Sequence, residues 1–263
     1  MNRIDQLFNG KGENILSIYF TAGHPELNST EEIILELDKS GADLIEIGMP
    51  YSDPMADGPT IQESGSIALK NGMTLTLLFD QLKGIRTKTN IPLLMMGYLN
   101  QMMQFGVDNF LENCVNIGID GLIIPDLPVD IYEVEFMDKI VSHGLHTIFL
   151  ITPQTTEERI RKIDKLGSGF VYMVSDASIT GAKSGISNHQ LKYFQRVNKM
   201  ELKNPRLIGF GISNYDTFFH ACKYASGAII GSAFIKALGD NSMDINERIS
   251  RFISSIRGQV EIN

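Results

Sequence analysis

Short apolar segments alternate with helix-like segments along this 263-residue chain, and this alternation constrains the fold most. The apolar segments are rich in β-branched residues, which is typical of buried strands. We predict strands over residues 15–20, 43–47, 92–96, 121–125, 146–151, 170–174, 206–209 and 227–230. We predict helices between them over residues 29–39, 75–87, 107–116, 132–142, 156–166, 189–197, 215–223 and 247–255. Repeated strand–helix units imply parallel strands joined by helical crossovers.

Eight such units favour a single closed (β/α)8 barrel, a TIM barrel with extra helices. An open, doubly wound sheet is the alternative. The length of 263 residues is close to the ~250 residues that are typical of one such barrel. No Pro-rich or Ser-rich linker and no change of composition divides the chain. We therefore expect one domain that spans residues 1–263.

Glycines follow several of the predicted helices. Gly41, Gly118, Gly144 and Gly167 each stand just after an amphipathic segment. A helix often ends with a residue in the left-handed conformation, which glycine adopts without steric cost. We expect a left-handed cap at each of these four positions.

Composition excludes several classes of protein. The formal net charge of −8 and the pI of about 5.2 argue against a nucleic-acid binder, which needs basic patches. The apolar runs are shorter than a ~20-residue membrane span, and the N-terminus lacks the apolar core of a secretion signal. Cys114 and Cys222 are predicted to be free thiols, and no Cys/His spacing suggests a metal site. We expect a cytoplasmic protein.

Glu46 lies at the end of a predicted strand, directly before a long loop rich in Pro and Gly. In a barrel of this kind, functional side chains gather at the C-terminal ends of the strands and in the loops that follow. Burial raises the pKa of a carboxyl group and lets it exchange protons near neutral pH. Glu46 is therefore a candidate general acid and base. The alternative is a buried acid that pairs with a neighbouring cation.

Asp53 and Asp57 lie on the loop after Glu46 and complete the first candidate cluster. Two acids in one pocket can divide their roles, one exchanging protons and the other remaining a fixed anion. The Asp57-Gly58-Pro59 sequence also suits a helix start, where an aspartate often caps the helix. Capping is therefore the alternative for Asp57.

Glycines near the ends of the last strands suggest a phosphate site. They lie in three short motifs: Thr180-Gly181-Ala182, Gly209-Phe210-Gly211-Ile212-Ser213 and Gly231-Ser232-Ala233. Loops after strands seven and eight of a barrel often hold a phosphate through backbone N–H groups and the start of a short helix. Ordinary turns use the same residues and are the alternative.

The loop over residues 175–185 has the composition of a lid that closes over a ligand, although an ordinary exposed loop is nearly as well supported. Tyr172 ends the preceding predicted strand, where its hydroxyl can point into the mouth of the barrel. A buried ring with a hydrogen-bonded hydroxyl is the alternative.

These motifs resemble the tryptophan synthase alpha-subunit family along nearly the whole chain. The loop from Glu46 to Gln62 matches most specifically, including Ser-Asp-Pro and Ala-Asp-Gly-Pro. The first-strand motif at residues 19–25, Pro-Asp-Leu-Pro at residues 125–128 and the late glycine motifs support the match. His24 stands where an acid is usual, Gln101 where a proline is common, and Asp176 where some relatives carry a basic residue.

The resemblance implies a carbon–carbon lyase of tryptophan biosynthesis. The family cleaves indole-3-glycerol phosphate to indole and glyceraldehyde 3-phosphate. By this resemblance Glu46 is the general acid–base residue and Asp57 binds the indole nitrogen. The other implied ligand contacts are Tyr172, Tyr19, Met96, Leu127 and Phe210 around the indole, and Gly181, Gly211, Gly231 and Ser232 around the phosphate.

The resemblance also implies a partner. The loops after strands two and three are expected to face a beta subunit in an alpha2beta2 heterotetramer. That subunit joins indole to serine with pyridoxal phosphate, so no cofactor is expected in this chain. His24 is not a proposed proton-transfer residue, whereas Gln101 and Asp176 bear on coupling to the partner and on the lid. Two alternatives remain at this stage: another phosphate-binding barrel enzyme, such as a sugar-phosphate isomerase, and a poorly active subunit that mainly regulates its partner.

Overall fold

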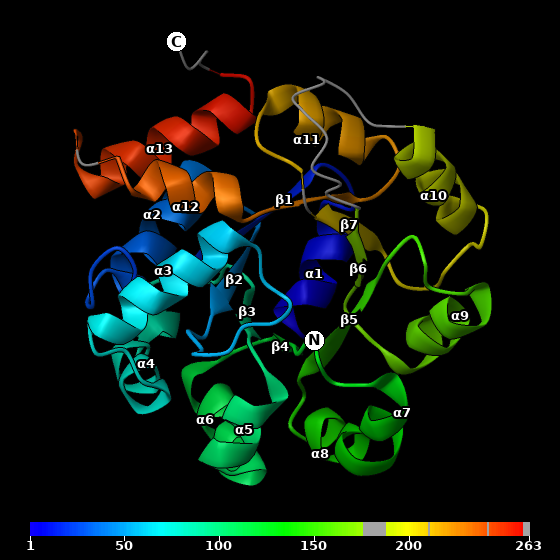
Figure 1. Ribbon diagram of the computed structural model, residues 1–263, viewed down its shortest axis with the longest axis horizontal. Helices are drawn as coiled ribbons and strands as arrows, with labels where there is room; N and C mark the ends of the chain where they lie inside the picture. Colours follow the sequence, from blue (N-terminus) through cyan, green and yellow to red (C-terminus); the bar gives the residue numbers. More distant parts are fainter. Residues whose placement is uncertain (176–187, 210, 241, 260–263) are drawn as a thin grey trace.

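Eight parallel strands form a closed barrel in the computed structural model, which describes residues 1–175, 188–209, 211–240 and 242–259 (Figure 1). Each strand pairs with its neighbours along the chain, and β8 closes the ring by pairing with β1. The strands are β1 (Ile15–Thr21), β2 (Leu44–Gly48), β3 (Leu93–Met96), β4 (Gly121–Ile123), β5 (His146–Ile151), β6 (Val171–Val174), β7 (Arg206–Gly209) and β8 (Gly227–Ile230). The prediction of a closed barrel is confirmed, and the open sheet is wrong.

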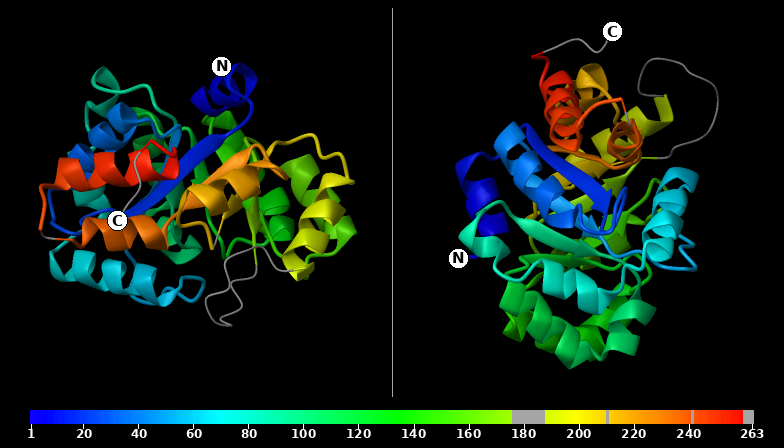
Figure 2. Two further views of the ribbon diagram at one scale, coloured as in Figure 1. Left: turned by 90° about the horizontal axis from the view of Figure 1, so that it is seen from above. Right: turned by 90° about the vertical axis from the view of Figure 1, so that its left-hand side faces the viewer.

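Helices surround the ring of strands (Figures 1 and 2). Most lie between successive strands: α2 (Thr30–Ser40), α3 (Pro59–Lys70), α4 (Leu75–Gln81), α5 (Leu99–Phe105), α6 (Val107–Ile117), α7 (Val129–Ile131), α8 (Met137–Ser142), α9 (Glu157–Leu166), α10 (Asn188–Asn198) and α11 (Tyr215–Cys222). Two short helical turns, η1 (Ile85–Thr87) and η2 (Tyr132–Phe136), join them. The remaining helices are α1 (Arg3–Gly10) before β1, and α12 (Ser232–Leu238) and α13 (Ile245–Ile256) after β8.

Helix α1 covers the N-terminal end of the barrel (Figure 2, left). Its Ile4 is fully buried and belongs to the apolar cluster that fills the barrel interior, together with residues such as Ile15, Leu44 and Phe170. Arg3 pairs with Asp120, which directly precedes β4, at an N–O distance of 3.0 Å. The strands therefore open only at their C-terminal ends, where the candidate site residues lie.

A second, larger apolar cluster lies between the strands and the surrounding helices. It includes Phe20 and Ile45, which alternate along β1 and β2 with the interior side chains of the same strands. Both faces of each strand are buried, as expected for a parallel sheet covered by helices. No described helix is long and apolar enough to cross a membrane.

One of the four expected glycine caps is wrong. Gly41, Gly118 and Gly144 have φ angles of 99°, 78° and 72°, in the left-handed region. Gly167 has φ of −75°. A Cβ at Gly167 would lie 2.9 Å from the carbonyl oxygen of Ile163, so close packing explains the glycine there.

Candidate active site

Glu46 is fully buried in the barrel interior, on β2. It is level with Tyr19 of β1 on one side and Leu94 of β3 on the other. The hydroxyl of Ser17 donates a hydrogen bond of 2.8 Å to Oε1 of Glu46. The other carboxyl oxygen, Oε2, has no partner among the described residues. No described cation pairs with Glu46, so the described residues give no support to the alternative of a buried ion pair.

Burial raises the pKa of Glu46 from 4.5 to about 8, and the hydrogen bond from Ser17 partly opposes this rise. Water cannot solvate a charge at this position, and a single hydroxyl replaces only part of that solvation. The carboxyl group is therefore mainly protonated at pH 7. A neutral carboxyl group can give a proton to a ligand and later take one back.

Asp57 lies on the loop between β2 and α3, where its carboxylate meets a tyrosine. The hydroxyl of Tyr98 donates a hydrogen bond of 3.0 Å to Oδ2 of Asp57, and the same hydroxyl accepts one of 2.9 Å from the N–H of Ala56. Burial raises the pKa of Asp57, and the bond from Tyr98 opposes the rise. Gly58 is the N-cap of α3 and has no side-chain cap, so the capping alternative for Asp57 is wrong.

Asp53 does not join this pair. Its side chain is exposed and accepts a hydrogen bond of 2.5 Å from its neighbour Ser52. The first candidate cluster is therefore reduced to Glu46 and Asp57.

Tyr19 and Tyr172 bring the two acids into one electrostatic environment. Both rings are buried, and burial is the main cause that raises the pKa of each hydroxyl. The charges of Asp57 and Glu46 raise both tyrosine pKa values further, so both carboxyl groups act on both hydroxyls. These residues come from β1, β2, β6 and the loop after β2, and they meet at the barrel mouth.

Two glycines make room for the tyrosine rings. A Cβ placed on Gly48, at the end of β2, would collide with the ring and hydroxyl of Tyr19. A Cβ on Gly209, at the end of β7, would collide with Tyr172 in the same way. Each ring therefore lies flat against the end of a strand, and any larger residue at either glycine would push it into the mouth.

The structure adds Tyr98 and Ser17 to the site, which the sequence analysis missed. Tyr98 follows β3 and stacks on Tyr51 with 5.1 Å between ring centroids. Its position just after a strand is the signal that identifies it, because this is where barrel function concentrates. Ser17 lies two residues before Tyr19, so the strand period of two places both on the inner face.

Met96 and Leu127 lie at the same end of the barrel as predicted. Met96 is the half-buried last residue of β3. Leu127 is buried on the loop after β4. Both are apolar side chains at the C-terminal ends of neighbouring strands.

The late glycine loops also meet at this end. Gly211 has φ of 76° and open space around it, and Gly231 is the N-cap of α12, whose first residue is Ser232. A Cβ on Gly231 would lie 3.4 Å from the ring of Tyr19, so this loop borders the acid-containing mouth. The predicted contacts Gly181 and Phe210 lie outside the described residues, as do Asp176 and nearly all of the loop over residues 175–185.

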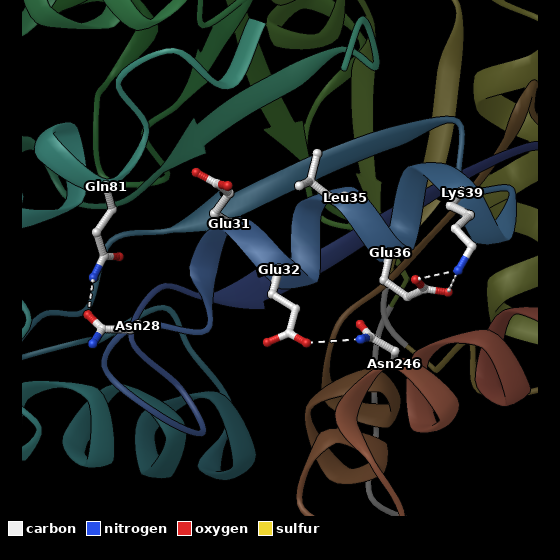
Figure 3. Close-up of a pocket in the computed structure, with 8 residues that line it drawn as sticks. All are labelled: Asn28, Glu31, Glu32, Leu35, Glu36, Lys39, Gln81 and Asn246. Atoms are coloured by element: carbon white, nitrogen blue, oxygen red, sulfur yellow. Dashed lines mark hydrogen bonds and ion pairs between the residues drawn. The ribbon is translucent and has the colours of Figure 1, made fainter. Parts of the chain in front are cut away.

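A surface hollow elsewhere on the molecule is lined mainly by polar and charged side chains, several of which bond to one another (Figure 3). It lies on the outside of α2, where Asn246 of α13 donates a hydrogen bond of 2.9 Å to Glu32 and Lys39 pairs with Glu36 at 3.0 Å. The first contact joins two helices, and the second lies within α2. Oε1 of Gln81, which also lines the hollow, has no described partner, but an amide group does not exchange protons as the carboxyl group of Glu46 can.

The comparisons with known proteins agree on one family. The family model described as "Tryptophan synthase alpha chain" matches residues 6–261. The tryptophan synthase alpha chain of Flavobacterium psychrophilum is 57% identical over 256 residues, which is 97% of this chain and 100% of the relative. Among solved structures, subunit alpha from Legionella pneumophila has a TM-score of 0.88 and 32% identity, covering 98% of each chain. A tryptophan synthase complex from Pyrococcus furiosus has a TM-score of 0.85 and 35% identity, covering 94% of this chain and 98% of its own.

Proposed function

We propose a mechanism for the barrel mouth from one premise: the chain belongs to the tryptophan synthase alpha chain family. It is a carbon–carbon lyase of tryptophan biosynthesis, which cleaves indole-3-glycerol phosphate to indole and glyceraldehyde 3-phosphate. Indole passes to a beta subunit, the partner of this family's chains. The roles of the individual residues below are the proposal.

Glu46 transfers both protons of the reaction. Its neutral carboxyl group gives a proton to C3 of the indole ring, which places positive charge on the ring nitrogen. The bond between C3 and the glycerol side chain then breaks, and its electron pair returns to the ring. The side-chain hydroxyl loses its proton to the Glu46 carboxylate and becomes the aldehyde of glyceraldehyde 3-phosphate. Glu46 ends the cycle protonated, so atoms and charge balance without another reactant.

Asp57 stabilises the charge that develops on the ring. The interaction between a fixed anion and the indole N–H becomes stronger as the nitrogen becomes positive. This stabilises the transition state more than the bound substrate and lowers the barrier to cleavage. The hydrogen bond from Tyr98 supports this role, because it favours the ionised form of Asp57 against the effect of burial.

The remaining predicted residues bind the two ends of the substrate. Tyr19, Tyr172, Met96, Leu127 and Phe210 surround the indole in this proposal. Gly181, Gly211, Gly231 and Ser232 bind the phosphate through backbone N–H groups and the Ser232 hydroxyl. A phosphate held at this rim orients the bond that breaks, which supplies part of the rate enhancement.

The other expectations for the chain belong to the same proposal. We propose one domain over residues 1–263, a cytoplasmic location and an alpha2beta2 assembly. Pyridoxal phosphate belongs to the beta subunit, and the proton transfers above use only side chains of this chain. We therefore propose that the alpha reaction needs no cofactor here. Among the described residues, no group of three or more His, Cys, Asp or Glu side chains is placed to hold a metal ion.

The observation that carries the proposal is the buried Glu46, which has no cation partner and one unpartnered oxygen among the described residues. The test is indole release from indole-3-glycerol phosphate, with and without a beta subunit. Glu46→Gln should lower kcat by roughly a thousandfold or more in both conditions, because it removes the proton donor and acceptor. Substrate binding should change little.

Glu36→Gln is the matched control, because Glu36 is also buried but lies on α2 and pairs with Lys39. It should retain wild-type turnover. Unchanged turnover in Glu46→Gln would reject the role of Glu46. Loss of turnover only when the beta subunit is present would instead support the regulatory alternative.

A further inference from the structure

Ser17 is a buried hydroxyl in the apolar interior of the barrel. Its side chain is fully buried, and its neighbours in register are Leu44 of β2 and Ile229 of β8. A buried hydroxyl without a partner costs free energy, and apolar neighbours offer it none. The Ser17 hydroxyl donates its hydrogen bond to Oε1 of Glu46, at 2.8 Å.

We propose that Ser17 is a positioning residue for the alpha reaction, which makes Oε2 of Glu46 the oxygen that carries the transferred proton. This inference rests on the proposed role of Glu46. Beyond that role, it specifies which oxygen of Glu46 transfers the proton, and that Ser17 selects this oxygen.

The hydrogen-bond donors and acceptors around the carboxyl group give its two oxygens different roles. A neutral carboxyl group has one oxygen that bears the proton and one that only accepts. Ser17 donates to Oε1, so Oε1 is the accepting oxygen and the proton resides on Oε2. Oε2 is buried and has no described partner, so no described group competes with a substrate for its proton.

The other polar groups around Glu46 do not orient its carboxyl group. They are the hydroxyls of Tyr19 on β1 and Tyr172 on β6, and the carboxylate of Asp57 on the loop after β2. Both tyrosine pKa values are raised, so both hydroxyls stay protonated, and neither forms a hydrogen bond to Glu46 among the described contacts. Asp57 bonds to Tyr98 instead. Ser17 thus sets the orientation of the carboxyl group by itself among the described contacts.

After Glu46 gives up its proton, the hydrogen bond from Ser17 also stabilises the resulting carboxylate. A hydrogen bond to an ionised carboxylate is stronger than one to a neutral group. Ser17 therefore stabilises the carboxylate that must form midway through the cycle, and it lowers the pKa of Glu46 relative to burial alone.

The test compares Ser17→Ala with Ser17→Thr in the full-length chain. Glutamate labelled with ¹³C at the carboxyl carbon reports the pKa of Glu46 by NMR titration, and the signal is assigned by its loss in Glu46→Gln. Ser17→Ala should raise this pKa by about one unit, because it removes a donor to the ionised form. Ser17→Thr should keep the wild-type value, because it keeps the hydroxyl.

Turnover with the beta subunit present gives the second readout. Ser17→Ala should lower kcat at pH 7 by roughly tenfold with KM within about twofold, because the carboxyl group is misoriented after binding. The fall of kcat with rising pH, near pH 8 in the wild type, should move upward in Ser17→Ala and stay in place in Ser17→Thr. Ser29→Ala is the control, because the buried Ser29 hydroxyl bonds only to backbone carbonyls in the loop after β1.

The outcomes separate this inference from the proposed function. An unchanged pKa and kcat in Ser17→Ala would overturn the role of Ser17 while an inactive Glu46→Gln still supported Glu46. A lower pKa in Ser17→Ala would also overturn it, because Ser17 would then accept a proton from the carboxyl group. An active Glu46→Gln would overturn the proposed function, whatever the Ser17 variants show in the titration.

Discussion

At the scale of single residues, the site is organised by the cost of burying charge. Glu46 lies where no described cation compensates a carboxylate, so it stays protonated to a pKa of about 8. Asp57 is also partly buried, yet it receives a hydrogen bond from Tyr98 that favours ionisation. Each acid thus receives one hydrogen bond from a hydroxyl group, and the two differ in burial: Glu46 is fully buried and Asp57 only partly, which is how one pocket obtains a proton donor and a fixed anion.

The raised pKa of Glu46 predicts how stability depends on pH. Between pH 4.5 and about 8 the folded chain keeps a proton on Glu46 that the unfolded chain has lost. Stability from this group is therefore complete below pH 4.5 and is lost as pH rises through about 8. Glu46→Gln stays neutral, so its free energy of unfolding should exceed that of the wild type by about 4 kcal/mol at pH 8.5 and by less than about 1 kcal/mol at pH 4.5.

Urea unfolding of both chains at several pH values between 4.5 and 8.5 measures this difference. Glu36→Gln again serves as the control and should show no gap that widens with pH. A constant difference between wild type and Glu46→Gln across this range would mean that Glu46 is already ionised in the folded chain.

At the scale of helices and strands, most of the fold could be predicted from the sequence. The strands over residues 146–151, 206–209 and 227–230 have the bounds that the pattern predicts, because β-branched runs between loop residues mark buried strands. The helix predicted over residues 75–87 is instead α4 followed by η1, with Gly84 in a left-handed conformation between them. The segment 132–142 contains η2, a π-helical turn, which apolar periodicity does not predict.

Several helices were not among the predicted segments. They are α1, α3, α5, α7 and α12. Helices α5 and α12 have seven residues each, too few for a clear apolar period. Helix α1 covers the end of the barrel rather than a flank of the sheet, so its role depends on long-range packing of Ile4.

The packing of α1 predicts a change in stability without a change in turnover. Ile4→Ala should lower the free energy of unfolding by about 2–4 kcal/mol, because it leaves a cavity in the barrel interior. The acids lie at the opposite end of the strands, so kcat should stay close to the wild type. Urea unfolding and turnover of the same preparation measure both quantities.

Ile131→Ala is the matched control, because Ile131 is 40% exposed at the surface. It should change stability by less than about 1 kcal/mol. A large loss of kcat in a folded Ile4→Ala chain would mean that α1 supports the mouth as well as the core.

At the scale of the whole molecule, closing the ring brings together residues that are distant in the sequence. Ser17, Glu46, Tyr98 and Tyr172 come from separate strands or their following loops, and Gly231 follows the last strand. The rule that barrel function lies at the C-terminal strand ends identified Glu46, Asp57 and the late glycines from the sequence. It did not identify hydrogen-bond partners, because whether Tyr98 reaches Asp57 or Ser17 reaches Glu46 depends on side-chain packing across the ring.

Two exposed methionines lie on the surface that is expected to face the beta subunit. Met55, on the loop after β2, is 96% exposed, and Met103, in α5 after β3, is 56% exposed. Exposed methionines suit an apolar, adaptable contact. They lie in the segments after β2 and β3, where the resemblance expects the partner.

A crystal structure of the full chain with an unreactive substrate analogue, an indole carrying a propyl phosphate chain, tests the central claim most directly. The account predicts C3 of the indole within hydrogen-bonding reach of Oε2 of Glu46, the ring nitrogen beside Asp57, and the phosphate at Gly211, Gly231 and Ser232. An analogue bound with its ring away from both acids, or with its phosphate at another part of the barrel, would contradict it.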